Sequence, residues 1–143
     1  MVLVVDDHGD TREALVRLLK REGYDAIGVK CGGEALLFLQ THAVGLVVLD
    51  YHMPDMDGLA VLADMRRDPR LAEVPVILFT ADIGRLKERA MQQGVNAYVE
   101  KGTLDWGRLL AEVRRLAGQT TPQVDAPQVG EVERPDGLRK CEG

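Results

Sequence analysis

The chain has 143 residues, of which 45% are hydrophobic and 29% charged, an ordinary composition for one soluble globular domain. Its net charge of −5 disfavours nucleic acid as a direct partner, because binding to a phosphate backbone depends on clustered Lys and Arg. No apolar stretch approaches the roughly 20 residues of a membrane span, and the N-terminal sequence lacks the pattern of a secretory signal. We therefore expect a cytoplasmic protein that binds neither a membrane nor nucleic acid directly.

Short runs of Val, Ile and Leu alternate along the chain with segments of helical periodicity. The first run, residues 2–5, ends at Asp6-Asp7 and precedes a helix that we expect to begin at a capping box, residues 10–13, and to stop at Gly23. The remaining strands are expected at residues 24–29, 44–49, 74–79 and 95–99. The remaining helices are expected at residues 33–40, 57–67, 83–93 and 104–117. This alternation predicts a doubly wound α/β domain, in which helices cover both faces of a five-stranded parallel sheet.

The periodic patterns stop after residue 117. The stretch beyond it contains Pro122, Pro127, Pro135 and scattered acids, without apolar periodicity. We therefore divide the chain into a folded domain, residues 1–117, and a flexible C-terminal tail, residues 118–143.

Polar side chains follow four of the five predicted strands. Asp6 and Asp7 follow the first strand, Asp50 the third, Thr80 the fourth and Lys101 the fifth. Each alone would most often be a helix N-cap or a solvated side chain. Because the carboxyl ends of parallel strands meet at one edge of a sheet, we expect all of them to lie together. Three crowded carboxylates suit a small hard cation such as Mg²⁺, and an opposing lysine and hydroxyl suit a phosphoryl group.

These residues give the chain a resemblance to the receiver domains of response regulators in two-component signalling, of the chemotaxis-regulator type. The matching segments fall in the family's order on the strand ends: Asp6-Asp7, Asp50 with Met53-Pro54-Asp55-Met56-Asp57-Gly58, Phe79-Thr80-Ala81, and Ala97-Tyr98-Val99-Glu100-Lys101. The resemblance covers residues 2–117. It implies a flavodoxin-like fold with strand order 2-1-3-4-5.

The resemblance also implies a metal site and an acceptor for a phosphoryl group. Asp50 would be the phosphoacceptor, and a sensor histidine kinase or a histidine phosphotransfer protein would be the donor. Mg²⁺ would be the cofactor, held by the side chains of Asp7 and Asp50, by the backbone carbonyl of His52, and by Asp6 through water.

A switch and an output are implied as well. Lys101 would contact the phosphate, Thr80 would move towards it, and Tyr98 would rotate inwards behind Thr80. The protein would then be a regulatory phosphoacceptor rather than an enzyme acting on a separate substrate, and its conformational change would alter binding to an unknown downstream protein. It departs from the family pattern at Gly102, where a proline forming a cis bond is usual, and this predicts a less rigid support for Lys101.

Three other interpretations are compatible with the residues. The chain could be the receiver fragment of a larger regulator or hybrid kinase, with the tail as a linker. It could be a pseudo-receiver that acts without phosphorylation. A haloacid-dehalogenase-like phosphatase also uses Asp, Thr, Lys and Mg²⁺, but its nucleophile lies in an Asp-x-Asp motif, whereas Asp6 and Asp7 are adjacent here.

Overall fold

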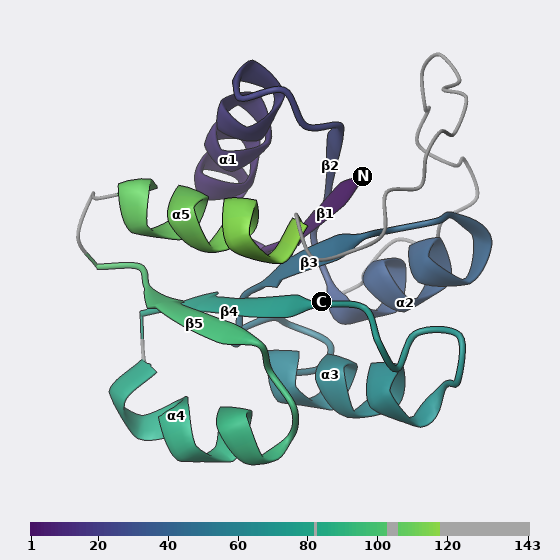
Figure 1. Cartoon of the computed structure of the whole chain (residues 1–143). Coiled ribbons are helices and arrows are strands. Elements are labelled where there is room, and N and C mark those ends of the chain that lie inside the picture. Colours follow the sequence, from purple (N-terminus) through teal and green to yellow (C-terminus); the bar gives the residue numbers. More distant parts are fainter. Residues whose placement is uncertain (82, 103–105, 118–143) are drawn as a thin grey trace.

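A computed structural model describes residues 1–81, 83–102 and 106–117 of the chain (Figure 1). Its strands are β1 (Val2–Val5), β2 (Ala26–Val29), β3 (Leu46–Leu49), β4 (Val76–Thr80) and β5 (Ala97–Glu100). Its helices are α1 (Gly9–Arg21), α2 (Gly32–Thr41), α3 (Gly58–Arg67), α4 (Ile83–Gln92) and α5 (Trp106–Ala117). The predicted tail, residues 118–143, lies outside the described residues.

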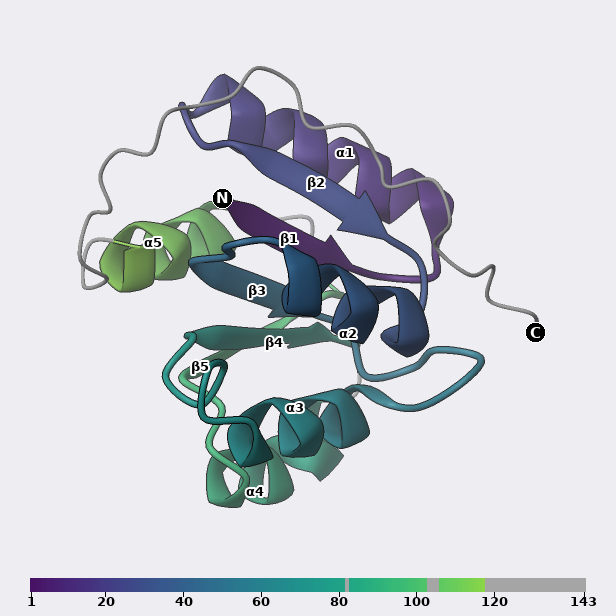
Figure 2. The ribbon, with the colours of Figure 1, turned by 90° about the vertical axis from the view of Figure 1, so that its right-hand side faces the viewer.

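The five strands form one parallel sheet in the order β2-β1-β3-β4-β5, as predicted. Helices α1 and α5 cover one face, and α2, α3 and α4 cover the other (Figures 1 and 2). The chain therefore reverses its winding between β1 and β3, the two strands that lie side by side at the centre of the sheet. In open α/β sheets the binding site lies beyond the carboxyl ends of the strands at this switch point.

Alternate residues of each central strand enter two separate cores. Val2 and Val4 pack with Leu15 and Leu19 of α1 and with α5, whereas Leu3 and Val5 point to the α2–α3–α4 side. All four residues of β3 are buried, because both faces of the sheet are covered. Across the described residues, no helix has both the length and the apolar character needed to span a membrane.

Helix α1 begins at Gly9, not at the predicted capping box. His8 occupies the N-cap position and makes no side-chain cap hydrogen bond, and the Arg12 amide donates to the His8 carbonyl at 3.0 Å. The helix starts early because the Asp6 carboxylate accepts a hydrogen bond from the His8 amide at 2.9 Å and turns the chain directly after β1. Asp57, the residue at which the third helix was expected to begin, is the N-cap of α3, and its carboxylate accepts a hydrogen bond from the Ala60 amide at 2.8 Å.

Arg66, near the end of α3, joins three segments at the end of the sheet where its strands begin, opposite their carboxyl ends. Its guanidinium donates to the carbonyls of Val74 and Gly94 at 2.9 Å and to Asn96 Oδ1 at 3.0 Å. Gly94 has a φ of 97°, a conformation that favours glycine, and this brings its carbonyl within reach. Burial lowers the pKa of Arg66, and the charge of Glu73 partly opposes that effect. The single side chain thus fixes the loops that precede β4 and β5.

Replacing Arg66 should destabilise the fold far more than replacing its neighbour. Arg66→Ala leaves several carbonyls without their charged donor, so we expect a loss of about 2–3 kcal/mol in the free energy of unfolding. Arg67→Ala is the matched control, because Arg67 is largely exposed and forms a surface ion pair with Asp64, so its loss should cost about 0.5 kcal/mol or less. Urea denaturation of both variants measures the difference. Equal losses would contradict the role of Arg66.

Candidate functional site

The sheet brings two acids together at its switch point. Asp6 directly follows β1 and Asp50 directly follows β3, and the last residues of those strands, Val5 and Leu49, are paired in register. The Asp50 amide donates to the Val5 carbonyl at 3.0 Å, which extends the ladder one residue beyond the strand. The two carboxylates therefore start from adjacent points of the backbone.

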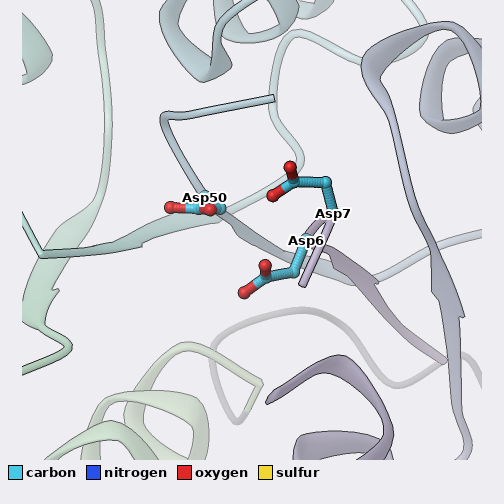
Figure 3. A group of neighbouring side chains, drawn as sticks. All are labelled: Asp6, Asp7 and Asp50. Atoms are coloured by element: carbon cyan, nitrogen blue, oxygen red, sulfur yellow. The ribbon is translucent and has the colours of Figure 1, made fainter. Parts of the chain in front are cut away.

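Asp6, Asp7 and Asp50 form a compact carboxylate cluster at this edge (Figure 3). One carboxylate oxygen from each lies within 4.8 Å of the others. Asp6 and Asp50 are only 2% and 5% exposed, whereas Asp7 is exposed to solvent. The cluster is thus two buried acids with a third at their solvent side.

Lys101 bridges the two buried acids. Its Nζ lies 2.9 Å from Asp6 Oδ2 and 3.3 Å from Asp50 Oδ2. Its backbone amide donates to the Thr80 carbonyl at 3.0 Å, so pairing of β5 with β4 places the lysine at this edge. The sequence predicted a contact of Lys101 with a phosphate at Asp50; the shorter contact to Asp6 was not predicted.

The charges of the cluster perturb one another. Burial is the main cause that raises the pKa of Asp50 above its usual value; the Asp6 carboxylate raises it further, while Lys101 and the Tyr51 amide act in the opposite direction. Burial tends to lower the pKa of Lys101, but its hydrogen bond to Asp6 and the charges of both acids outweigh burial and raise that pKa. In this state the ionised form of Asp50 is therefore under-stabilised, despite the nearby lysine.

The loop that follows β3 lies in close contact with the start of α3. The Gly58 amide donates to the Tyr51 carbonyl at 2.8 Å, and a Cβ on Gly58 would lie 2.3 Å from the Asp50 carbonyl oxygen. Only glycine permits this approach, which explains the residue at that position of the predicted motif. The Tyr51 amide donates to Asp50 Oδ1 at 2.8 Å. His52 is exposed in the same loop, with its ring edge-on to Tyr51.

The other predicted residues lie on the neighbouring strands. Thr80 ends β4 and is fully buried, and it is paired in register with Glu100 of β5. Tyr98 is half-buried against the α2–α3–α4 core, with Lys87 Nζ 5.4 Å from the centre of its ring. Their movement on activation stays a prediction. No cis peptide bond occurs among the described residues, and Gly102 is exposed directly after Lys101.

The donor set of the cluster fits a magnesium ion. It consists of carboxylate oxygens, the hard ligands that Mg²⁺ prefers, and one of them is open to solvent. A divalent cation there would also offset the repulsion between Asp6 and Asp50 that Lys101 alone does not remove. Lys101 contacts Asp50 at this same edge of the sheet, and Thr80 ends the adjacent strand β4.

Comparison with known proteins identifies a family and relatives in it. The family of response regulator receiver domains matches residues 2–114. The chemotaxis protein CheY1 of Helicobacter pylori is 35% identical over 103 residues, which cover 70% of this chain and 83% of CheY1. A probable transcriptional regulator, ycf27 of Pyropia yezoensis, is 33% identical over 133 residues, which cover 90% of this chain and 53% of that protein. The chain thus spans about half the length of the second relative.

A solved structure extends the likeness to three dimensions. It is the response regulator protein TrrA of Thermotoga maritima in complex with Mg²⁺-BeF, which superposes with a TM-score of 0.73 at 31% identity. The match covers 80% of this chain and 96% of that one.

Replacing Asp50 with asparagine should stabilise the metal-free protein. Burial raises the pKa of Asp50, so the folded state binds a proton at this carboxyl group more tightly than the unfolded state does. At a pH above this pKa the group is ionised in both states, and its charge then lowers the stability of the folded protein. Asp50→Asn removes this penalty, so we expect the Tm at neutral pH to rise by a few degrees. The rise should shrink as the pH falls through the pKa of Asp50, where the wild type becomes protonated.

Asp10→Asn is the control, because Asp10 is exposed and its loss changes the net charge equally. Scanning calorimetry from neutral to acidic pH measures both variants. A lower Tm for Asp50→Asn than for the wild type at neutral pH would contradict the electrostatic account.

Proposed function

Because this chain belongs to the family of response regulator receiver domains, we propose that it is a signalling switch whose phosphoacceptor is Asp50. One observation carries the assignment to this residue. Asp50 directly follows β3, the middle strand of the sheet; it is buried, it contacts Lys101, and it lies beside Asp6 and Asp7. The other acids of its loop, Asp55 and Asp57, bond to backbone amides of helices α2 and α3.

We propose that Asp7 and Asp50 bind Mg²⁺ through their side chains, that Asp6 contributes through water, and that the backbone carbonyl of His52 completes the protein ligands. The support is the oxygen-only donor set and its mutual spacing. When bound, the ion supplies positive charge against the oxygens of the incoming phosphoryl group.

The proposed chemistry is the transfer of a phosphoryl group to a carboxylate. A carboxylate oxygen of Asp50 forms a bond to phosphorus while the P–N bond of a donor phosphohistidine breaks, and the bonding electron pair stays on the imidazole nitrogen, which takes up a proton. Lys101, already in contact with Asp50, offsets the charge of the phosphoryl oxygens. The residues contribute positioning and charge neutralisation, which are the main requirements of phosphoryl transfer.

Phosphorylation would then shift the protein between two states. A new dianion at Asp50 favours an arrangement in which the Thr80 hydroxyl donates to it, and Tyr98 would turn inwards behind Thr80. Turning Tyr98 would break its contact with Lys87 of α4, so the surface at α4 and β5 would change.

The proposed donor is a sensor histidine kinase or a histidine phosphotransfer protein, and the proposed output is binding to a downstream protein in the cytoplasm. We take residues 1–117 as the receiver unit. The similarity to CheY1 along most of its length, and to ycf27 along half of its length, accommodates either a stand-alone regulator or the receiver part of a longer one. The phosphatase alternative loses its support, since the chain belongs to a family of regulatory phosphoacceptor domains.

Incubation with acetyl phosphate and Mg²⁺ should add one phosphoryl group, a mass of about 80 Da, to the wild-type protein. Asp50→Asn should abolish the adduct, because it removes the acceptor carboxylate. Asp57→Asn is the matched control in the same loop: it keeps an oxygen that can cap α3 and should retain the adduct. Mass spectrometry of the intact protein measures all three.

Absence of any adduct on the wild type, both with acetyl phosphate and with candidate kinases, would reject the switch and favour a pseudo-receiver. An adduct that persists in Asp50→Asn would reject Asp50 as the acceptor.

A further inference from the structure

Asp55 ties the loop between β3 and α3 to a helix far away in the sequence. Its Oδ1 accepts hydrogen bonds from the amides of Gly32 at 3.0 Å and Met56 at 2.8 Å, and its Oδ2 accepts from the amide of Gly33 at 2.8 Å. Gly32 and Gly33 form the first turn of α2. One carboxylate thus accepts three backbone hydrogen bonds, two of them from a different element.

Asp55 takes the place of an N-cap for α2. The residue at the N-cap position, Cys31, makes no side-chain cap hydrogen bond. The first amides of a helix lack partners within the helix, and a negative charge is favourable at that end of the helix dipole. The carboxylate of Asp55 supplies the acceptors for these amides and the negative charge, and it attaches the loop to the start of α2.

The start of α2 is shaped to receive this loop. A Cβ on Gly32 would lie 2.3 Å from Met56 Cγ and 2.9 Å from Val61 Cγ2, so a larger residue would push the loop away. A Cβ on Gly33 would lie 3.2 Å from Asp55 Oδ2. The two glycines therefore let the backbone of α2 approach Asp55 and Met56 closely.

We propose that Asp55 is a positioning residue for the metal site, which acts by holding the loop that carries His52. The inference rests on the proposed function, in which the His52 carbonyl is a metal ligand. The loop is fixed at its base by the bond between the Gly58 amide and the Tyr51 carbonyl. Without the Asp55 carboxylate, the residues between Tyr51 and Asp57 lose two hydrogen bonds to the backbone of α2, and His52 lies in that stretch.

The effect of Asp55 on the metal site should also be visible at the Gly32 and Gly33 amides, which donate to its carboxylate. If metal binding and the Asp55 contact favour the same loop position, then Mg²⁺ must also stabilise the hydrogen bonds from the Gly32 and Gly33 amides. Opening of these bonds is visible as hydrogen exchange of the two amides. A purely structural cap would slow their exchange equally with and without the metal.

The experiment compares the wild type with Asp55→Ala, Asp55→Asn and Asp68→Ala. Asp68→Ala is the control, since it also removes a carboxylate that accepts a backbone hydrogen bond, from the Arg70 amide at 3.0 Å, but it lies after α3 at the far edge of the sheet. Calorimetric titration with Mg²⁺ gives the dissociation constant. Amide exchange of Gly32 and Gly33, with and without Mg²⁺, gives the second readout, and exchange of the β1 amides checks that each variant is folded.

We expect Asp55→Ala to weaken Mg²⁺ binding by about tenfold, as is typical for the loss of a residue that orients a metal ligand. Asp55→Asn should fall between Asp55→Ala and the wild type, because it keeps one of the two acceptor oxygens. Asp68→Ala should bind like the wild type. In the wild type, Mg²⁺ should slow exchange of the Gly32 and Gly33 amides, and Asp55→Ala should lose that effect.

Wild-type affinity in Asp55→Ala, or an equal weakening in Asp68→Ala, would overturn the positioning role while leaving the proposed function intact. Exchange of the two amides that does not respond to bound Mg²⁺ would overturn it as well. Failure of the wild type itself to bind Mg²⁺ would overturn both the metal site and this inference.

Discussion

The central physical constraint is the burial of two carboxylates side by side at the end of a parallel sheet. Asp6 and Asp50 are almost completely shielded from water, and Lys101 forms an ion pair with both carboxylates. Burial is the main reason why the pKa of Asp50 is raised, and the charge of Asp6 adds to it, because the single positive charge of Lys101 is shared by two carboxylates and compensates only in part. The site is therefore poised to gain from any group that brings further positive charge, and a divalent cation does so most directly.

The fold produces this arrangement through its topology. The chain reverses its winding between β1 and β3, so the two central strands carry their following residues, Asp6 and Asp50, to the same point. The pairing of β5 with β4 then brings Lys101 to the same edge. Burial of both sheet faces by helices fixes the strands, while Arg66 at the opposite edge fixes the loops that enter β4 and β5. The hydrogen bonds of Arg66 and the carboxylate cluster therefore lie at opposite ends of the strands.

Much of this could be predicted because the relevant signals are local. Apolar runs bounded by turn residues located the strands, and the rule that parallel strands end at one edge brought the acids, Thr80 and Lys101 together. Helix starts were less predictable, because α1 is set by the Asp6 carboxylate and not by the capping box that follows. The contact of Asp55 with α2 depends on residues 22 and 23 positions away, and the lysine's closer approach to Asp6 depends on rotamers. No pattern in the sequence predicts these two contacts. The adjacent Gly32 and Gly33 are a local feature that permits close approach of another segment to α2, but they do not show which segment it is.

The most direct test of the electrostatic account is the Tm of the unphosphorylated protein as a function of Mg²⁺ concentration, at constant ionic strength maintained with NaCl. A ligand that binds the folded state alone stabilises it by an amount that grows with the logarithm of its concentration. We expect the wild-type Tm to rise in that manner with Mg²⁺, and the rise to disappear in Asp7→Asn, which loses the solvent-exposed carboxylate of the cluster. A wild-type Tm that does not change with Mg²⁺ would contradict the claim that the carboxylate cluster is a cation site.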